Sequence, residues 1–197
     1  MNYLAHAYLS FGNKDILLGN MISDFVKGRQ QFNYPAVIHK GIVLHRFIDE
    51  FTDNHAATKE AKEVFRKDYR LYSGAFVDVV YDHYLATDAN EFATETALFE
   101  FSQSTYEKLE PQQQWMPPFF ESIFFYMRTQ NWLYGYRTHA GIKQAFGGLV
   151  RRSAYLQDSY MAEEIFEEHY ELLGDCYRQF WRDMKPFAQQ KLNELLN

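Results

Sequence analysis

Residues 75–110, AFVDVVYDHYLATDANEFATETALFEFSQSTYEKLE, contain neither glycine nor proline. Residues 42–73 and 149–173 form two further stretches of this kind, and none of the three alternates apolar and polar residues as a strand would. Glycine and proline mark the places where helices can end, so long stretches without them favour helices. We therefore predict an all-α protein built as a multi-helix bundle.

The glycines and prolines divide the remaining sequence in the same way. Helices are expected near residues 2–10, 14–27, 36–51, 55–71, 75–86, 91–107, 117–134, 139–156, 159–173 and 175–195. The sequence has no internal repeat and no linker rich in serine and glycine, so residues 1–197 are predicted to form a single domain.

The composition excludes several classes of protein. The chain has 197 residues, a net charge of −6 and one cysteine, Cys176, which cannot form an internal disulfide bond. No secretory leader is recognisable, so we expect a cytoplasmic location. No uncharged apolar run reaches the roughly 18 residues of a membrane span, and the acidic balance disfavours a nucleic-acid partner.

Charge is distributed unevenly along the second half of the chain. Residues 122–157 contain no Asp or Glu, whereas residues 158–183 are rich in both. The basic residues of the acid-free segment are Arg128, Arg137, Lys143, Arg151 and Arg152. They either form a positive surface for an acidic partner or pair with the neighbouring acidic helices.

Three expected helices carry polar residues at a spacing of four, which places the side chains on one face of a helix. The pairs are Asn20 with Asp24, His45 with Asp49, and Asp78 with Asp82, which precedes His83; Asn2 and His6 repeat the spacing.

The third pair lies in a segment that is apolar around most of its circumference, so its carboxylates are expected to be buried. A buried carboxylate needs a cation, either a protein group such as Arg46 or a divalent metal. Oxygen and imidazole ligands without thiolates suit Mn, Mg, Fe or Zn. His6 is equally well explained as a hydrogen-bonded core histidine, and Asn20 as a partner of the backbone.

Six stretches, in order, give the chain a resemblance to the bacterial acyl carrier protein phosphodiesterases. They are MNYLAHAYLS, LLGNMISDFVKG, GIVLHRFIDEFTDN, DVVYDHYL, NWLYGYR and LVRRSAYL. The family is understood as an atypical branch of the HD-type phosphohydrolases: all-α, metal-dependent and favouring manganese. Its members release phosphopantetheine from a serine of acyl carrier protein. The His-Asp dipeptide typical of HD proteins is absent here, and Asp82-His83 stands in reverse order.

The resemblance implies roles for the candidate residues. The metal ligands would come from Asp24, His45, Asp49, Asp82 and His83, with Asp78 orienting the histidines. Lys27 and Arg46 would hold the phosphate, and His6 would donate a proton to the leaving group. Arg137, Arg151 and Arg152 would bind the acidic carrier protein, and Trp132 and Tyr136 would line the path of the pantetheine arm.

Two other functions remain open at this point. One is the hydrolysis of a small nucleotide or phosphoester at the same metal site. The other is a non-catalytic helical module that binds an acidic protein. The sequence carries no signal of how chains associate.

Overall fold

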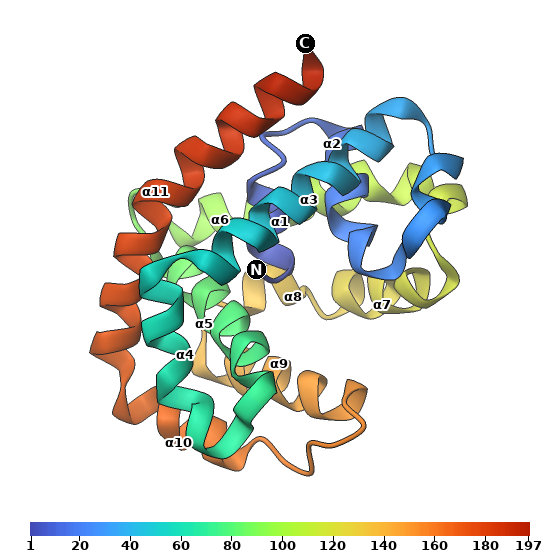
Figure 1. Ribbon diagram of the computed structural model, residues 1–197. Helices are drawn as coiled ribbons and strands as arrows, with labels where there is room; N and C mark the ends of the chain where they lie inside the picture. Colours follow the sequence, from blue (N-terminus) through green and yellow to red (C-terminus); the bar gives the residue numbers. More distant parts are fainter.

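All regular structure in the computed structural model, which describes residues 1–197, is helical (Figure 1). The α-helices are α1 (Tyr3–Tyr8), α2 (Lys14–Ile22), α3 (Ala36–Asn54), α4 (Ala56–Tyr69), α5 (Ser73–Thr87), α6 (Glu95–Leu109), α7 (Pro118–Thr129), α8 (Trp132–Gly135), α9 (His139–Arg152), α10 (Tyr160–Glu168) and α11 (Tyr170–Leu196). Short 3-10 helices are η1 (Ser23–Phe25), η2 (Gly28–Asn33), η3 (Arg70–Tyr72) and η4 (Glu110–Trp115). The predicted all-α class is confirmed. None of the helices combines the length and the apolar character that crossing a membrane demands.

Several helices begin where the sequence predicts their starts, and a polar side chain caps the first turn. The side chain of Asn13 accepts hydrogen bonds from two amides at the start of α2, and Thr138 accepts one at the start of α9. These contacts satisfy amides that have no partner within the helix.

Several expected helix boundaries differ from the structure: the helices expected over 14–27 and 139–156 end at Ile22 and Arg152, and the one expected over 91–107 begins at Glu95. Two further differences change where a helix is interrupted. The segment expected as one helix over 117–134 is interrupted at Asn131, whose φ of 49° is left-handed and separates α7 from α8. The break expected at Gly174 lies instead at His169, and Gly174 is inside α11. A Cβ at Gly174 would stand 3.2 Å from the Tyr84 ring, so this glycine permits close packing of α11 and does not end the helix.

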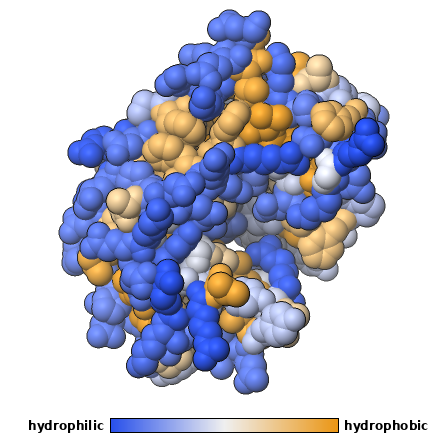
Figure 2. Space-filling view, in the orientation of Figure 1, coloured by the Kyte–Doolittle hydropathy of each residue, from blue (hydrophilic) through white to orange (hydrophobic).

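One cluster of 51 buried hydrophobic residues takes side chains from every α-helix. Helix α5 is buried on most of its surface, with α1, α4, α9 and α11 packed around it (Figure 1). The face of the molecule in Figure 2 is largely hydrophilic, and it is hollowed near its middle, where α8 and the N-terminus lie in Figure 1.

Helices α2 and α3 touch through their backbones. A Cβ at Gly19 would lie 2.0 Å from the carbonyl oxygen of Ile38, and one at Gly41 would lie 2.4 Å from that of Ile16. No side chain fits at either position. Because Asn20 follows Gly19 directly, the contact brings the end of α2 against the middle of α3.

Glu91, in the loop after α5, ties α1 to α11. Its carboxylate accepts hydrogen bonds from the Tyr8 hydroxyl, from Trp181 Nε1 at 2.9 Å and from Lys185 Nζ at 2.5 Å. The short helix α1 is therefore fixed at its C-terminal end by groups that are distant in the sequence.

Candidate metal centre

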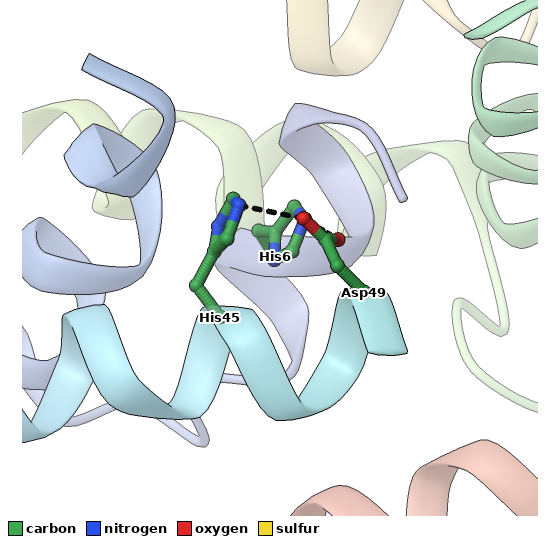
Figure 3. A group of neighbouring side chains, drawn as sticks. All are labelled: His6, His45 and Asp49. Carbon is green, nitrogen blue, oxygen red and sulfur yellow. Dashed lines mark ion pairs between the residues drawn. The ribbon is translucent and has the colours of Figure 1, made fainter. Parts of the chain in front are cut away.

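Two histidines from different helices lie face to face. His6 is on α1 and His45 on α3; both are buried, and their rings stack with centroids 3.9 Å apart. Asp49, one turn after His45, places Oδ2 2.9 Å from His45 Nε2 and Oδ1 3.3 Å from His6 Nε2 (Figure 3). One ligand atom from each of the three residues lies within 4.8 Å of the other two.

Asn20 sets the orientation of both rings. His6 Nδ1 donates to the side-chain oxygen of Asn20 at 2.8 Å, and His45 Nδ1 donates to its backbone oxygen at 2.7 Å. The Asn20 amide nitrogen in turn donates to the His6 carbonyl and to Ser10 Oγ, which fixes the amide. With both Nδ1 atoms donating, each Nε2 faces Asp49, where it carries a lone pair when the ring is neutral and donates a hydrogen bond when the ring is protonated. His6 Nε2 has no hydrogen-bond partner.

The two histidines of the site differ in charge. Burial lowers the pKa of His6 to about 4, and the neighbouring His45 adds to this effect. Burial alone would lower the pKa of His45 too, but hydrogen bonds to Asp24 and Asp49 raise it to about 9. Burial would raise the pKa of Asp49, yet the Met1 amino group and the imidazoles hold it far below its usual range. Asp49 is therefore ionised between a neutral His6 and a protonated His45, and a metal ion that binds here displaces the Nε2 proton of His45.

Asp24 completes the cluster on its solvent side. It lies in η1 at the end of α2, with Oδ1 3.2 Å from His45 Nε2, and its side chain is 69% exposed. The hydrogen bond from His45 lowers the pKa of this carboxyl, which burial would raise. Two imidazole nitrogens and two carboxylates fit a hard or borderline divalent ion. The unpartnered His6 Nε2 supports this fit, because a buried lone pair facing a carboxylate is unfavourable without a cation between them.

Asp82, predicted as a metal ligand, lies outside this cluster. It is fully buried, and its two oxygens accept hydrogen bonds from the amides of Leu4 at 2.7 Å and Ala5 at 3.0 Å. Burial raises its pKa to about 7 although the two amides lower it. Asp82 thus holds the N-terminal end of α1, and through α1 it positions His6.

His83 also lies outside the cluster. Its Nδ1 donates to the carbonyl oxygen of Tyr136 at 2.8 Å, and its Nε2 lies 3.0 Å from the Tyr170 hydroxyl. Both ring nitrogens therefore have partners within the protein. The reversed Asp82-His83 dipeptide points its two side chains in different directions, and the structure does not bring either to the imidazole pair.

Asp78 acts on the cluster through the N-terminal amine. Its Oδ1 is 3.1 Å from the amino nitrogen of Met1, which lies 3.4 Å from Asp49 Oδ1. Burial would lower the pKa of this amine, but Asp78 and Asp49 raise it to about 11. Asp78 does not contact the histidines that it was predicted to orient.

Lys27 and Arg46 lie near the cluster. They line one open hollow together with Asp24, His45 and Asp49. Arg46 Nη1 donates to Gln31 Oε1 at 2.7 Å, which holds the guanidinium on this side of α3. An anion beside the carboxylates would meet both cations.

The acid-free segment does not form one continuous positive surface. Three of its cations pair with acids: Arg128 with Glu110, Arg137 with Glu95 at 3.6 Å, and Lys143 with Glu163 at 2.9 Å. Arg151 and Arg152, at the end of α9, have no acidic partner, and Arg152 Nη1 lies 3.3 Å from the Tyr3 hydroxyl. The unpaired charge is therefore limited to two arginines beside α1.

The protein is thus all-helical, and its His45, Asp49 and Asp24 line a solvent-accessible hollow with His6 beside them, a donor set that can hold a divalent ion. Residues 1–184 match the family described as acyl carrier protein phosphodiesterase, and the chain belongs to this family. It is accordingly an enzyme, a hydrolase that acts on a phosphodiester bond.

Several curated relatives cover almost the whole chain. Acyl carrier protein phosphodiesterases of Yersinia pestis and Klebsiella pneumoniae subsp. pneumoniae are 34% and 33% identical to it, over 97% of this chain and 99% of each relative. The protein of the same name from Photorhabdus laumondii is 30% identical over 97% of this chain and 96% of its own. No solved structure matches the chain, so the likeness to HD-type phosphohydrolases stays a prediction.

Proposed function

We propose that this enzyme hydrolyses the phosphodiester that joins phosphopantetheine to a serine of acyl carrier protein, using a divalent ion held by His6, His45, Asp49 and Asp24. The names of the family and of its curated members support the substrate. The observation that carries the metal centre is the convergence of two imidazole Nε2 atoms, each fixed by Asn20, on the Asp49 carboxylate. Manganese follows from the resemblance and is compatible with the donor set.

A divalent ion there would neutralise charge on the phosphoryl oxygens and lower the pKa of a bound water. Lys27 and Arg46, in the same hollow, would hold the remaining phosphate oxygens. We assign His6 to the ligand set and not to proton donation, because a group with a pKa of about 4 is unprotonated at neutral pH. Asp82 and Asp78 are assigned positioning roles, through α1 and the N-terminal amine respectively.

Acyl carrier proteins are small and acidic, so a cationic surface near the site would guide docking. Arg151 and Arg152 fill this role best because no acid neutralises them. Arg137 is a weaker candidate, since it already contacts Glu95 and stacks on Tyr134. We also propose a cytoplasmic location, which the buried free thiol of Cys176 suits.

The direct test incubates the enzyme with holo carrier protein and Mn²⁺ and follows the mass of the carrier. We expect conversion to apo carrier, and loss of both turnover and bound metal in His45→Gln and Asp49→Asn. The control is His139→Gln, because His139 is an exposed histidine that pairs with Glu167 on another part of the surface. An unchanged carrier mass with folded, metal-loaded enzyme would refute the proposed substrate.

The same experiment separates the two alternatives. Faster hydrolysis of a small phosphodiester than of holo carrier, unaffected by reversing Arg151 and Arg152, would indicate a small-molecule phosphohydrolase. Carrier binding that survives His45→Gln without any metal in the wild-type protein would indicate a non-catalytic module.

A further inference from the structure

A groove that is partly open to solvent lies between α7, α8 and α9 and the start of α1, helices whose arrangement Figure 1 shows. Its walls include Phe119 and Ile123 of α7, Trp132 of α8 and Ala145 and Gly148 of α9. None of these residues belongs to the metal centre. Apolar walls with a few polar groups are typical of a site for a small molecule.

The groove adjoins the metal centre. Asn2 and Tyr3 line it, and they also line a small pocket whose other walls include His6, Asp24 and His45. Asp24 and His45 line both this small pocket and the hollow that holds Lys27 and Arg46. The centre therefore lies between a largely apolar groove and a cationic hollow.

Two glutamine side chains in the groove can form hydrogen bonds with an amide group of a ligand. Gln130 Oε1 accepts hydrogen bonds from Trp132 Nε1 and from Gln144 Nε2, both at 2.9 Å. This leaves the Gln130 NH₂ group and the Gln144 carbonyl oxygen without partners in the protein. One free donor beside one free acceptor is the complement of a secondary amide.

We propose that this groove binds the pantetheine arm of the substrate, with the phosphate end at the metal centre and the thiol end away from it. The inference rests on the proposed function. The arm consists of two amides, a branched aliphatic segment and a thiol, so it needs apolar walls with a few amide partners. Phe119, Ile123 and Trp132 supply the walls, and Gln130 and Gln144 supply the partners. Arg152 donates a hydrogen bond to Tyr3, which lines both the groove and the small pocket, so this arginine lies at the phosphate end.

Small residues on α9 keep the groove open, and one of them permits a clean test. A Cβ at Gly141 would collide with Gly135 O at 1.9 Å, so that glycine is needed for folding. A Cβ at Gly148 would meet only the flexible end of Arg151, at 3.7 Å. Gly148→Phe should therefore fold and fill the groove. Gly147→Phe is the matched control: its Cβ would meet the same arginine at 3.4 Å, but Gly147 does not line the groove.

The experiment measures binding of free 4′-phosphopantetheine and of inorganic phosphate by calorimetry, with Mn²⁺ present, to the wild type and both variants. We expect Gly148→Phe to weaken binding of 4′-phosphopantetheine at least about tenfold, because the bulky ring removes the site of the arm. Phosphate binding should be unchanged in both variants, and Gly147→Phe should match the wild type throughout. Equal affinity of wild type and Gly148→Phe for 4′-phosphopantetheine would overturn the proposal, as would equal weakening by Gly147→Phe.

Parallel measurement of holo-carrier hydrolysis separates the two proposals. If the carrier is cleaved but Gly148→Phe binds 4′-phosphopantetheine normally, the groove assignment alone fails. If the carrier is not cleaved but Gly148→Phe loses the arm selectively, the proposed function fails and the groove assignment stands.

Discussion

Asn20→Ala tests how the metal centre is held together. The Asn20 side chain is fully buried and makes three hydrogen bonds, with His6 Nδ1 at 2.8 Å, the His6 carbonyl at 2.8 Å and Ser10 Oγ at 3.1 Å. Each contributes about 1 kcal/mol, and the higher helix propensity of alanine offsets about 0.6 kcal/mol. We therefore expect a net loss of about 2–3 kcal/mol in the free energy of unfolding.

The same substitution should weaken metal binding without removing a ligand. The backbone oxygen that holds His45 remains, so only the His6 ring loses its orientation. Loss of such a supporting contact weakens metal affinity by about 10- to 100-fold. Urea unfolding in the presence of a chelator measures the first effect, and calorimetric titration with Mn²⁺ measures the second.

Ser10→Ala is the matched control for Asn20→Ala. It removes the hydroxyl that bonds Asn20 and the His6 carbonyl but leaves the contact with His6 Nδ1 in place. We expect reduced stability with metal affinity close to that of the wild type. A stability loss below about 1 kcal/mol in Asn20→Ala would refute the hydrogen-bond assignment. Unchanged metal affinity would refute the role of Asn20 in orienting a ligand.

Three further substitutions probe the supports of the site. Asp82→Ala leaves two buried amides at the start of α1 without a hydrogen-bond partner. It should lower the free energy of unfolding by about 3 kcal/mol, equally with and without metal. A loss of stability seen only in the metal-loaded protein would indicate that Asp82 is a metal ligand. Burial would raise the pKa of Glu91, but hydrogen bonds from Lys185, Tyr8 and Trp181 lower it below the usual value of 4.5. The ionised carboxylate therefore contributes its full stabilisation of the folded protein above pH 4.5, and this contribution is lost as the pH falls through the folded-state pKa. Glu91→Gln should therefore lower the urea midpoint most at neutral pH, and a difference that grows on acidification would contradict this sign. Reversing Arg151 and Arg152 to Glu should raise the KM for holo carrier about tenfold at low salt and much less at high salt; a salt-independent change would rule out electrostatic docking.

Local sequence patterns predicted the helices and one half of the site. His45 and Asp49 share a face of α3 because they are four residues apart, and the structure keeps them together. The same spacing applies to Asp78 and Asp82, but α5 is buried on nearly all sides and its acids meet the start of the chain. Spacing shows which side of a helix two residues share, and it carries no information about what lies opposite.

The role of His6 depends on contacts far away in the sequence. Its helix has only six residues and is positioned by Asp82 at one end and by Glu91 at the other. No local pattern specifies these partners. The acid-free segment shows the same limit: Arg128 and Arg137 pair with Glu110 and Glu95, which precede the segment, and neither is adjacent in sequence.

The glycine crossing of α2 and α3 has a consequence for ion selectivity. With backbones in contact at Gly19 and Gly41, the two helices cannot move closer or slide past each other without a clash, which restricts the spacing between Asp24, just after α2, and the histidine–aspartate face of α3. A rigid frame adapts poorly to larger ions, and Ca²⁺ in particular prefers six to eight oxygen ligands in a flexible shell. We expect the centre to discriminate against calcium by ionic radius.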